Sequence, residues 1–342
     1  MPYTLTLAIL LCIVFALSAF GTWKMIAWAH RRNIVDTPNH RSSHTLPTAR
    51  GGGVALVAAF YAGTAAAWAA GLLDARTVVL LCCGLPIAIV GYIDDARSLS
   101  ARTRLAVHAA AAAALLWGLW PLPALGIAGY RLPAPAVAVL YLLGLVWLTN
   151  LYNFMDGIDG IAAGQALAAG ALWAALAPGA VGVPALLFAA AAAGFLLYNF
   201  PPARIFMGDA GSGFCGFIVG ALVLHQADAT HTSPLLWLIP LSLFVCDATV
   251  TLATRVMRGQ RASEAHRSHA YQRLSRRVGR HLPVSAGYFA ATLVPLGAWF
   301  LWAGQQPGSR AGLAFVVAVA VPALLAVCLG AGREDTPAPP AR

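Results

Sequence analysis

The chain has 342 residues, of which 60% are hydrophobic and only 10% are charged. Soluble globular domains carry about 25% charged residues, so this chain has too few charges to cover a water-exposed surface. The apolar fraction excludes a disordered chain, and six cysteines in 342 residues exclude a disulfide scaffold. The composition therefore predicts an all-α, polytopic integral membrane protein.

Charge-free stretches give the expected membrane spans, because a helix needs about 20 mostly apolar residues to cross the hydrocarbon core. The sixth stretch has Pro178, Gly179 and Pro184 at its middle, which predicts two spans joined by a turn. The total is eleven transmembrane helices in one domain, residues 1–332, followed by a short disordered cytoplasmic tail at 333–342. The stretches are 1–23, 54–73, 77–93, 105–130, 132–155, 160–203, 210–227, 229–246, 281–309 and 311–332.

Basic residues indicate how these spans are oriented. If consecutive loops alternate across the membrane, nineteen of the 22 Lys and Arg residues fall on one side, and only Arg76, Arg131 and Arg310 fall on the other. Loops rich in Lys and Arg stay in the cytoplasm. We therefore expect the N-terminus outside and the C-terminus in the cytoplasm.

Acidic residues are also distributed unevenly. Of the 12 Asp and Glu residues, only Asp74 and Asp228 fall on the expected outer side. The positive-inside rule gives no reason for this, and neighbouring carboxylates repel one another unless a cation is present. Hard oxygen ligands select Mg²⁺ or Mn²⁺, so the pattern predicts a metal-dependent site at the cytoplasmic face. Eight acidic residues contribute to the pattern: Asp36, Asp94, Asp95, Asp156, Asp159, Asp209, Asp247 and Glu264.

Two aspartate pairs follow the third and fifth expected spans. Asp94 and Asp95 lie at a helix C-terminus, where partial negative charge disfavours carboxylates without a cation. Their alternative interpretation is a helix stop with solvated charges. In the segment NFMDGIDG at 153–160, Asp156 and Asp159 are three residues apart, so one helical turn would present both on one face. An N-cap and a turn would explain Asp156 but not Asn153 or Asp159.

Two further motifs lie near the eighth span and in the long basic loop. The segment NFPPARIFMGDAGSG at 199–213 contains small residues that permit close approach of a ligand, and the N–H groups of a starting helix suit a phosphate. Asp209 alone could be an ordinary N-cap. In EAHRSHAYQRL at 264–274, His266 and His269 lie among arginines, a pattern that favours polyphosphate recognition over a loop that only contacts lipid headgroups.

Two polar residues are expected to have lesser roles. Asp247 lies about two turns before Arg255 and is expected to be a helix-end charge paired with a neighbouring arginine. His108 follows Arg104 by one turn and is expected to pack or to reach towards the membrane interface.

In this order, the motifs resemble those of the polyprenyl-phosphate N-acetylhexosamine-1-phosphate transferases, of glycosyltransferase 4 type. The resemblance extends from about Asp36 to Leu274 and includes the span count. The segments 35–44 and 47–53 are most similar to the branch that initiates O-antigen synthesis. The segment around His266 and His269 lacks the adjacent histidines of the peptidoglycan branch, which argues against a MurNAc-pentapeptide donor.

The resemblance implies that a sugar 1-phosphate is transferred from a UDP-sugar to undecaprenyl phosphate and that UMP is released. The sugar is expected to be an N-acetylated hexosamine or 6-deoxyhexosamine. The resemblance places this initiating step of O-antigen, lipopolysaccharide or similar cell-wall polysaccharide synthesis at the cytoplasmic face of the bacterial inner membrane, with Mg²⁺ as cofactor. We expect direct attack by the lipid phosphate instead of a covalent aspartyl intermediate. The implied roles are catalytic for Asp94, Asp95, Asp156 and Asp159, substrate-binding for Asn153, Asn199, Arg50, His266, Arg267 and His269, and metal-binding for Asp209 and Asp95.

A secondary transporter or lipid flippase is the alternative. Transporters usually place ionisable residues near mid-membrane, between repeats. The middles of these spans contain almost no ionisable residues, and His108 is the main exception. Membrane lipids are expected partners and nucleic acid is not, because no soluble basic domain exists. The sequence leaves the identity of the UDP-sugar and the formation of a homodimer open.

Overall fold

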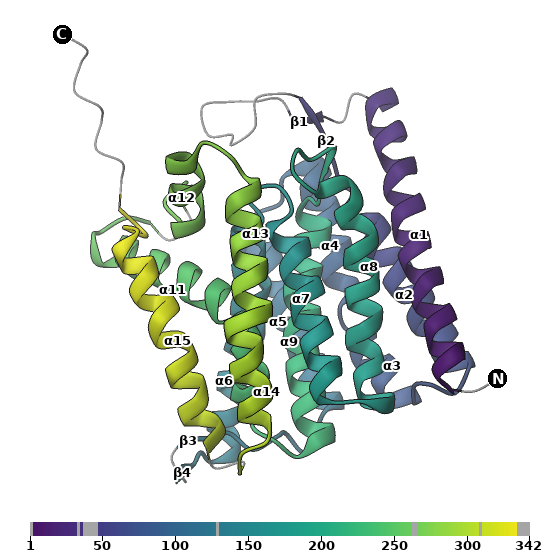
Figure 1. The fold of residues 1–342 in the computed structure, drawn as a ribbon, viewed down its shortest axis with the longest axis vertical. Coiled ribbons are helices and arrows are strands. Elements are labelled where there is room, and N and C mark those ends of the chain that lie inside the picture. The colour runs from purple at the N-terminus through teal and green to yellow at the C-terminus, as the bar shows by residue number, and fades with distance from the viewer. Residues whose placement is uncertain are drawn as a thin grey trace.

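The computed structural model describes residues 3–32, 35–36, 47–127, 130–261, 264, 266–307 and 310–333. Long helices run roughly side by side in one bundle (Figure 1). In chain order the helices are α1 (Tyr3–Arg32), α2 (Gly53–Ala69), α3 (Ala75–Cys82), α4 (Leu85–Arg97), α5 (Ala101–Gly118), α6 (Ala134–Met155), α7 (Ile161–Leu176), η1 (Gly179–Gly182), α8 (Val183–Asn199), α9 (Asp209–Thr230), α10 (Pro234–Trp237), η2 (Ile239–Leu241), α11 (Ser242–Met257), α12 (Ala270–Val278), α13 (Leu282–Ala291), η3 (Thr292–Leu296), α14 (Gly297–Gly304) and α15 (Ala311–Cys328).

The predicted multi-pass α-helical architecture is confirmed. Eight helical segments within the described ranges are long and apolar enough to cross a membrane. Helices α2 and α7 are apolar but have only 17 and 16 residues. Helix α5 has Arg102 and Arg104 near its start and is not among the eight. The count of eleven crossings therefore stays a prediction, as does the side of the membrane that each end faces.

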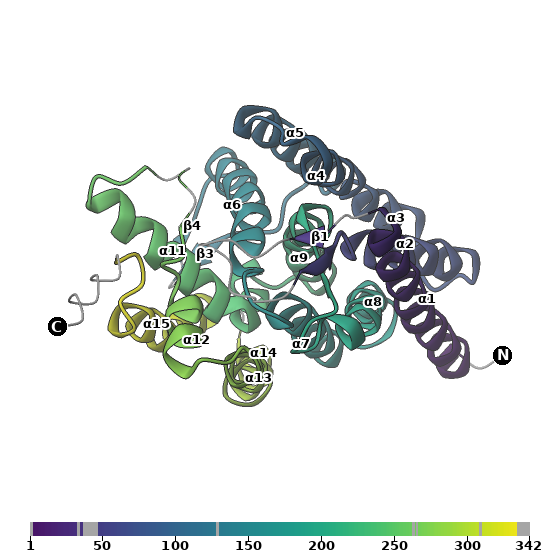
Figure 2. The same ribbon diagram turned by 90° about the horizontal axis from the view of Figure 1, so that it is seen from above.

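Helix α9 forms the centre of the bundle and α1 lies at its edge (Figure 2). In the most apolar part of each helix, 94% of the α9 residues are buried but only 17% of the α1 residues. Helix α4 approaches the start of α9 closely, because a Cβ atom at Gly91 would overlap the carbonyl oxygen of Asp209. The absence of a side chain at Gly91 therefore brings the last turns of α4 against the first residue of α9.

A small sheet at one end of the bundle brings distant segments together (Figure 1). Strand β2 (Thr48–Arg50) pairs antiparallel with β1 (Val35–Asp36) and parallel with β5 (Ile205–Phe206). Arg50 lies opposite Phe206, three residues before Asp209. A second pair, β3 (Gly126–Ile127) with β4 (Tyr130–Arg131), lies at the opposite end of the bundle. The three-stranded sheet thus positions Arg50 at the start of α9.

Candidate active site

Asp95 connects α4 to the N-terminus of α9. Its two carboxylate oxygens accept the backbone N–H groups of Asp209 and Ala210, each at 3.1 Å. The next two N–H groups, of Gly211 and Ser212, donate to the carbonyl oxygen of Gly208. The expectation that this helix start offers its free N–H groups to a phosphate is therefore wrong, because Asp95 and Gly208 already accept them.

Two arginines balance part of the negative charge of the three clustered carboxylates, Asp94, Asp95 and Asp209. The Arg50 guanidinium lies 2.8 Å from Asp95 Oδ1 and 3.3 Å from Asp209 Oδ1. The Arg104 guanidinium lies 2.6 Å from Asp94 Oδ2 and 3.7 Å from Asp209 Oδ2. Arg50 and Arg104 are partly exposed, so both remain accessible to a ligand. These arginines supply positive charge that the sequence argument assigned to a metal ion alone.

Asn153, at the end of α6, is also part of this cluster. Its Nδ2 donates to Asp209 Oδ1 at 3.1 Å and to Ser212 Oγ at 2.8 Å. Asp94 is fixed as well, since its Oδ1 accepts the N–H of Leu99 at 2.5 Å while Oδ2 pairs with Arg104. Asp209 differs, because its Oδ2 has a single ionic neighbour at 3.7 Å and its side chain is 26% exposed. Of these carboxylates, Asp209 is the one most available to a ligand.

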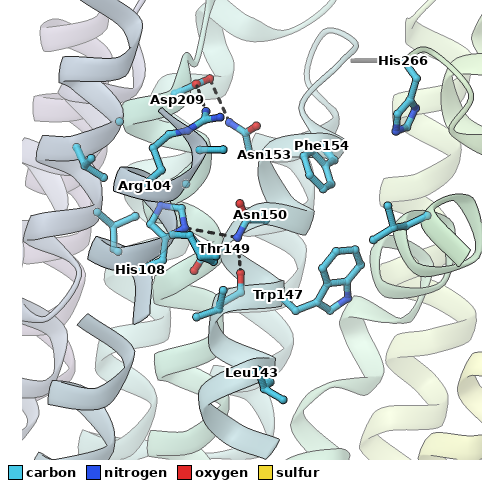
Figure 3. A pocket seen from close by; sticks show the side chains of 18 of the residues that line it. Arg104, His108, Leu143, Trp147, Thr149, Asn150, Asn153, Phe154, Asp209 and His266 are labelled. Carbon is cyan, nitrogen blue, oxygen red and sulfur yellow. Dashed lines mark hydrogen bonds and ion pairs between the residues drawn. The ribbon is translucent and has the colours of Figure 1, made fainter. Parts of the chain in front are cut away.

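A cavity of about 700 Å³ opens beside this cluster (Figure 3). Asp209, Arg104 and Asn153 line its polar end together with His266 and His269 from the segment before α12. The other walls are largely apolar, with His108, Thr149 and Asn150 as polar members. The apolar residues are Ile87, Val90, Leu105, Leu143, Val146, Trp147 and Leu252, of which Leu105 and Leu143 are more than half exposed. The cavity thus joins a charged end to apolar walls, and it brings together motifs that are far apart in the sequence.

Asp156 and Asp159 do not share a helical face. Helix α6 ends at Met155, and residues 156–160 form a turn in which Gly160 has a positive φ of 75°. The helical turn expected over 156–159 is therefore wrong, because the glycines redirect the chain. Burial, and then the charge of Asp209, raise the pKa of the partly buried Asp156 carboxyl well above its usual value.

Asp159 and Asn199 are buried and have local hydrogen-bond partners. Asp159 Oδ2 accepts the N–H of Ala203 at 3.0 Å and lies 3.1 Å from His281 Nδ1. Asn199 accepts the N–H of Gly160 and donates to the carbonyl oxygen of Ile205. These contacts join the turn after α6 to the segment before α9. The catalytic and nucleotide-binding roles expected for Asp159 and Asn199 stay predictions.

His266 and His269 stack on one another, with ring centroids 5.0 Å apart. Burial, and then the charge of His269, lower the pKa of His266 to about 4, so His266 is neutral at pH 7. Arg267, between them in the chain, is exposed. The expected pairing of Asp247 with an arginine is wrong, because Asp247 contacts His269 and Arg255 instead donates to the carbonyl oxygen of Arg261.

A magnesium ion fits the donor chemistry at Asp209. Mg²⁺ is usually held by one or two carboxylates, several waters and substrate phosphates, not by an all-protein cage. The described residues contain no group of three or more His, Cys, Asp and Glu side chains that could hold a metal ion. Asp209 would hold the ion through Oδ2, which has a single ionic neighbour at 3.7 Å, and the metal-binding role expected for Asp95 stays a prediction.

Arg104 and Ser212 are members of the cluster that the sequence argument did not assign to the site. A signal for Arg104 was present, since α5 begins one residue after Ser100, whose side chain accepts the N–H of Thr103. A short turn between two helices returns the second antiparallel to the first, which brings Arg104 back to Asp94. Ser212 contacts Asn153 across 59 residues of sequence, a contact that no local pattern indicates.

Comparison with known proteins identifies the family. The profile of glycosyl transferase family 4 matches residues 77–227. A "Probable undecaprenyl-phosphate N-acetylglucosaminyl 1-phosphate transferase" from Bacillus subtilis is 32% identical over 258 residues, covering 70% of this chain and 69% of that protein. The chain belongs to glycosyl transferase family 4. The resemblance inferred from the motifs is confirmed, and this chain is an enzyme of the sugar-1-phosphate transferase class.

Two further proteins similar to this chain have names that differ from that of the Bacillus subtilis relative. A "Decaprenyl-phosphate N-acetylglucosaminephosphotransferase" from Mycobacterium leprae is 29% identical over 292 residues, 75% of this chain and 73% of that protein. A "Phospho-N-acetylmuramoyl-pentapeptide-transferase" from Moorella thermoacetica is 36% identical over 159 residues, 40% of this chain and 49% of that protein. All three names describe transferases, which favours this class over the transporter alternative.

Proposed function

We propose that this protein transfers an N-acetylated hexosamine or 6-deoxyhexosamine 1-phosphate from a UDP-sugar to undecaprenyl phosphate, releasing UMP. The cavity is the observation that supports this proposal. Its charged end, at Asp209 and Arg104, suits phosphate groups and a metal ion, whereas its apolar walls suit an isoprenoid chain. A water-soluble acceptor has little apolar surface to bury against such walls, whereas an isoprenoid chain has much.

In the proposed reaction, an oxygen of the lipid phosphate attacks the sugar-linked phosphorus of the UDP-sugar. The bond from that phosphorus to the bridging oxygen breaks, and UMP leaves with the electron pair. Phosphoryl transfer needs mainly positioning and neutralisation of charge, which Arg50 and Arg104 provide here. Bound Mg²⁺ would add further neutralisation of the phosphate oxygens. A covalent intermediate would need an Asp94 oxygen that is free to attack phosphorus. Both Asp94 oxygens already have partners, Leu99 and Arg104, which favours direct attack by the lipid phosphate.

Purified protein incubated with undecaprenyl phosphate and a panel of UDP-sugars tests the activity through release of UMP. UDP-GlcNAc, UDP-GalNAc and the UDP-linked 6-deoxy sugars FucNAc and QuiNAc form the panel. We expect UMP release with at least one of them, complete loss in excess EDTA, and recovery with Mg²⁺ or Mn²⁺. Full activity in EDTA would contradict the metal assignment, and no UMP from any donor would contradict the proposed function.

We further propose that the charged end of the cavity faces the cytoplasm of the bacterial inner membrane, where UDP-sugars are made. The distribution of Lys and Arg supports this orientation. Single cysteines introduced in the loop 258–280 of a cysteine-free variant should react with an impermeant thiol reagent only after the membrane is opened. Labelling in intact, sealed cells would reverse the proposed orientation.

The choice among polysaccharide pathways is part of the same proposal. The chain fits an initiating step of O-antigen synthesis through its segments 35–44 and 47–53, although residues 37–46 lie outside the described part of the structure. The panel addresses this choice, because preference for a 6-deoxy sugar would support the O-antigen branch. Preference for the UDP-MurNAc-pentapeptide, added as a further donor, would contradict it.

A further inference from the structure

Asp247 is a buried carboxylate that the proposed reaction does not use. Its side chain is only 2% exposed, and it accepts five hydrogen bonds from three different helical regions. Oδ1 accepts from His269 Nδ1 at 3.3 Å, from the N–H of Ala270 at 2.8 Å and from Thr251 Oγ1 at 3.2 Å. Oδ2 accepts from the N–H of Tyr271 at 2.9 Å and from the hydroxyl of Tyr288 at 3.0 Å.

Part of this arrangement is architectural. The N–H groups of Ala270 and Tyr271 are the first two of α12, and such groups need acceptors from outside the helix. An anion at a helix N-terminus is also favoured by the helix dipole. A neutral acceptor would satisfy the same N–H groups, however, so capping alone does not explain why the carboxylate also binds an imidazole.

The contact with His269 determines where that imidazole places its proton. An ionised carboxylate only accepts hydrogen bonds, so Nδ1 of His269 is the donor in its contact with Asp247, and the same side chain also faces the backbone N–H of Gln272 as the N-cap of α12. The other ring nitrogen, Nε2, is then the one left for a ligand, because the partner of one nitrogen fixes the state of the other. The ring is further held between two stacked neighbours, His266 at 5.0 Å and Tyr271 at 5.6 Å between centroids.

His269 lines the same cavity as Asp209 and Arg104. Its neighbour His266 is neutral at pH 7, since its pKa is lowered to about 4 by burial and then by the charge of His269. Of the two stacked rings, His269 is the one that a carboxylate holds, with Asp247 Oδ1 3.3 Å from its Nδ1.

We propose that Asp247 is a positioning residue that holds the His269 imidazole with Nδ1–H directed at its carboxylate, so that Nε2 is the ring nitrogen presented to the nucleotide-sugar in the cavity. This inference rests on the proposed function for the identity of the ligand. The Asp247–His269 contact itself does not depend on it. Asp247 touches no substrate and acts through His269.

A double-mutant cycle separates positioning from capping. Asp247→Asn should lower kcat/KM for the UDP-sugar about 10- to 100-fold, the size of loss that follows when the carboxylate partner of a metal-ligating histidine is removed. In a His269→Gln background, Asp247→Asn should lower kcat/KM about twofold or less, because the imidazole that Asp247 positions is no longer there. A change of that size lies within the scatter seen for independent mutations. An equal loss in both backgrounds would overturn the proposal and leave Asp247 with a capping role only.

Tyr288→Phe is the matched control. It removes one donor from Asp247 Oδ2 and leaves the Oδ1 contact with His269 in place. We expect kcat/KM to stay close to that of the parent enzyme, even where the thermal unfolding midpoint falls. A loss of kcat/KM as large as that of Asp247→Asn would show that any disturbance of this carboxylate is sufficient, and would overturn the specific link to His269.

A spectroscopic measurement tests the contact without turnover. In detergent-solubilised protein labelled with ¹⁵N-histidine, the His269 resonances are assigned by their absence in His269→Gln. We expect a proton on Nδ1 in the parent protein, and a shift of the neutral ring towards the Nε2–H form in Asp247→Asn. A parent His269 with Nδ1 unprotonated would overturn the inference. Absence of UMP release would instead contradict the proposed function and leave this result unaffected.

Discussion

Asp209 and Asp159 flank the same end of the bundle, yet their environments differ in kind. The Asp209 side chain is 26% exposed, lines the cavity and has arginine neighbours on both oxygens. The Asp159 side chain is only 11% exposed and is held by the N–H of Ala203 and by His281. Carboxylates of the first kind keep an oxygen available to a cation or a ligand. Those of the second kind stabilise the connection between two segments of chain.

Asp209→Asn should have the largest effect on turnover. The amide keeps the shape but removes the charge that Mg²⁺ needs, and a loss of about 3 kcal/mol in transition-state stabilisation corresponds to a roughly hundredfold lower rate. UMP release over a Mg²⁺ titration measures this, with the yield of folded protein as control. Turnover equal to that of the parent would remove Asp209 from the metal site.

Arg104→Ala should have a smaller effect, because Arg50 remains beside Asp209. We expect about a tenfold lower kcat/KM, equivalent to about 1.4 kcal/mol. Arg102→Ala is the matched control, since Arg102 is exposed in the same turn of α5 and should leave UMP release unchanged. Arg104→Lys should recover part of the rate by restoring the charge. Equal losses in Arg102→Ala and Arg104→Ala would indicate only a general effect of basic charge.

Asp159→Asn should reduce turnover least and stability most. Weakening buried, charge-assisted contacts to Ala203 and His281 should lower the free energy of unfolding by about 1–3 kcal/mol. Thermal unfolding in detergent measures this, and Asp209→Asn serves as the comparison because partly exposed ion pairs contribute little to stability. A stable Asp159→Asn protein as inactive as Asp209→Asn would place both carboxylates in the reaction and abolish the distinction between them.

Much of the site could be predicted from the sequence because membrane proteins avoid carboxylates without a function. Asp94, Asp95 and Asp209 were identified in this way and Asn153 through the motif at 153–160, and the structure brings all four together. The helices were predictable from apolar stretches for the same physical reason. Apolarity alone does not show where a span bends or how long its helix is, so α2 and α7 came out shorter than their stretches.

Partners could not be predicted where the contact joins separate helices. Nothing near Asp247 in the chain indicates that it meets His269, 22 residues later. The sequence indicates Arg104 only as a charge that orients the chain in the membrane, although Arg104 pairs with Asp94 across the loop between α4 and α5. The spacing of Asp156 and Asp159 predicts a helical turn, but the chain turns without helix at 156–160, because Gly160 adopts a φ of 75° that disfavours other residues.

The pairing of β2 with β5 has a consequence for the charge balance of the site. Each of these strands has at most three residues, and side chains alternate between the two faces of a strand. A slip of one residue in the pairing of Ala49 with Ile205 would turn Arg50 to the opposite face. Asp95 and Asp209 would then lose their shared cation, so the register of a very short sheet sets the net charge at the mouth of the cavity.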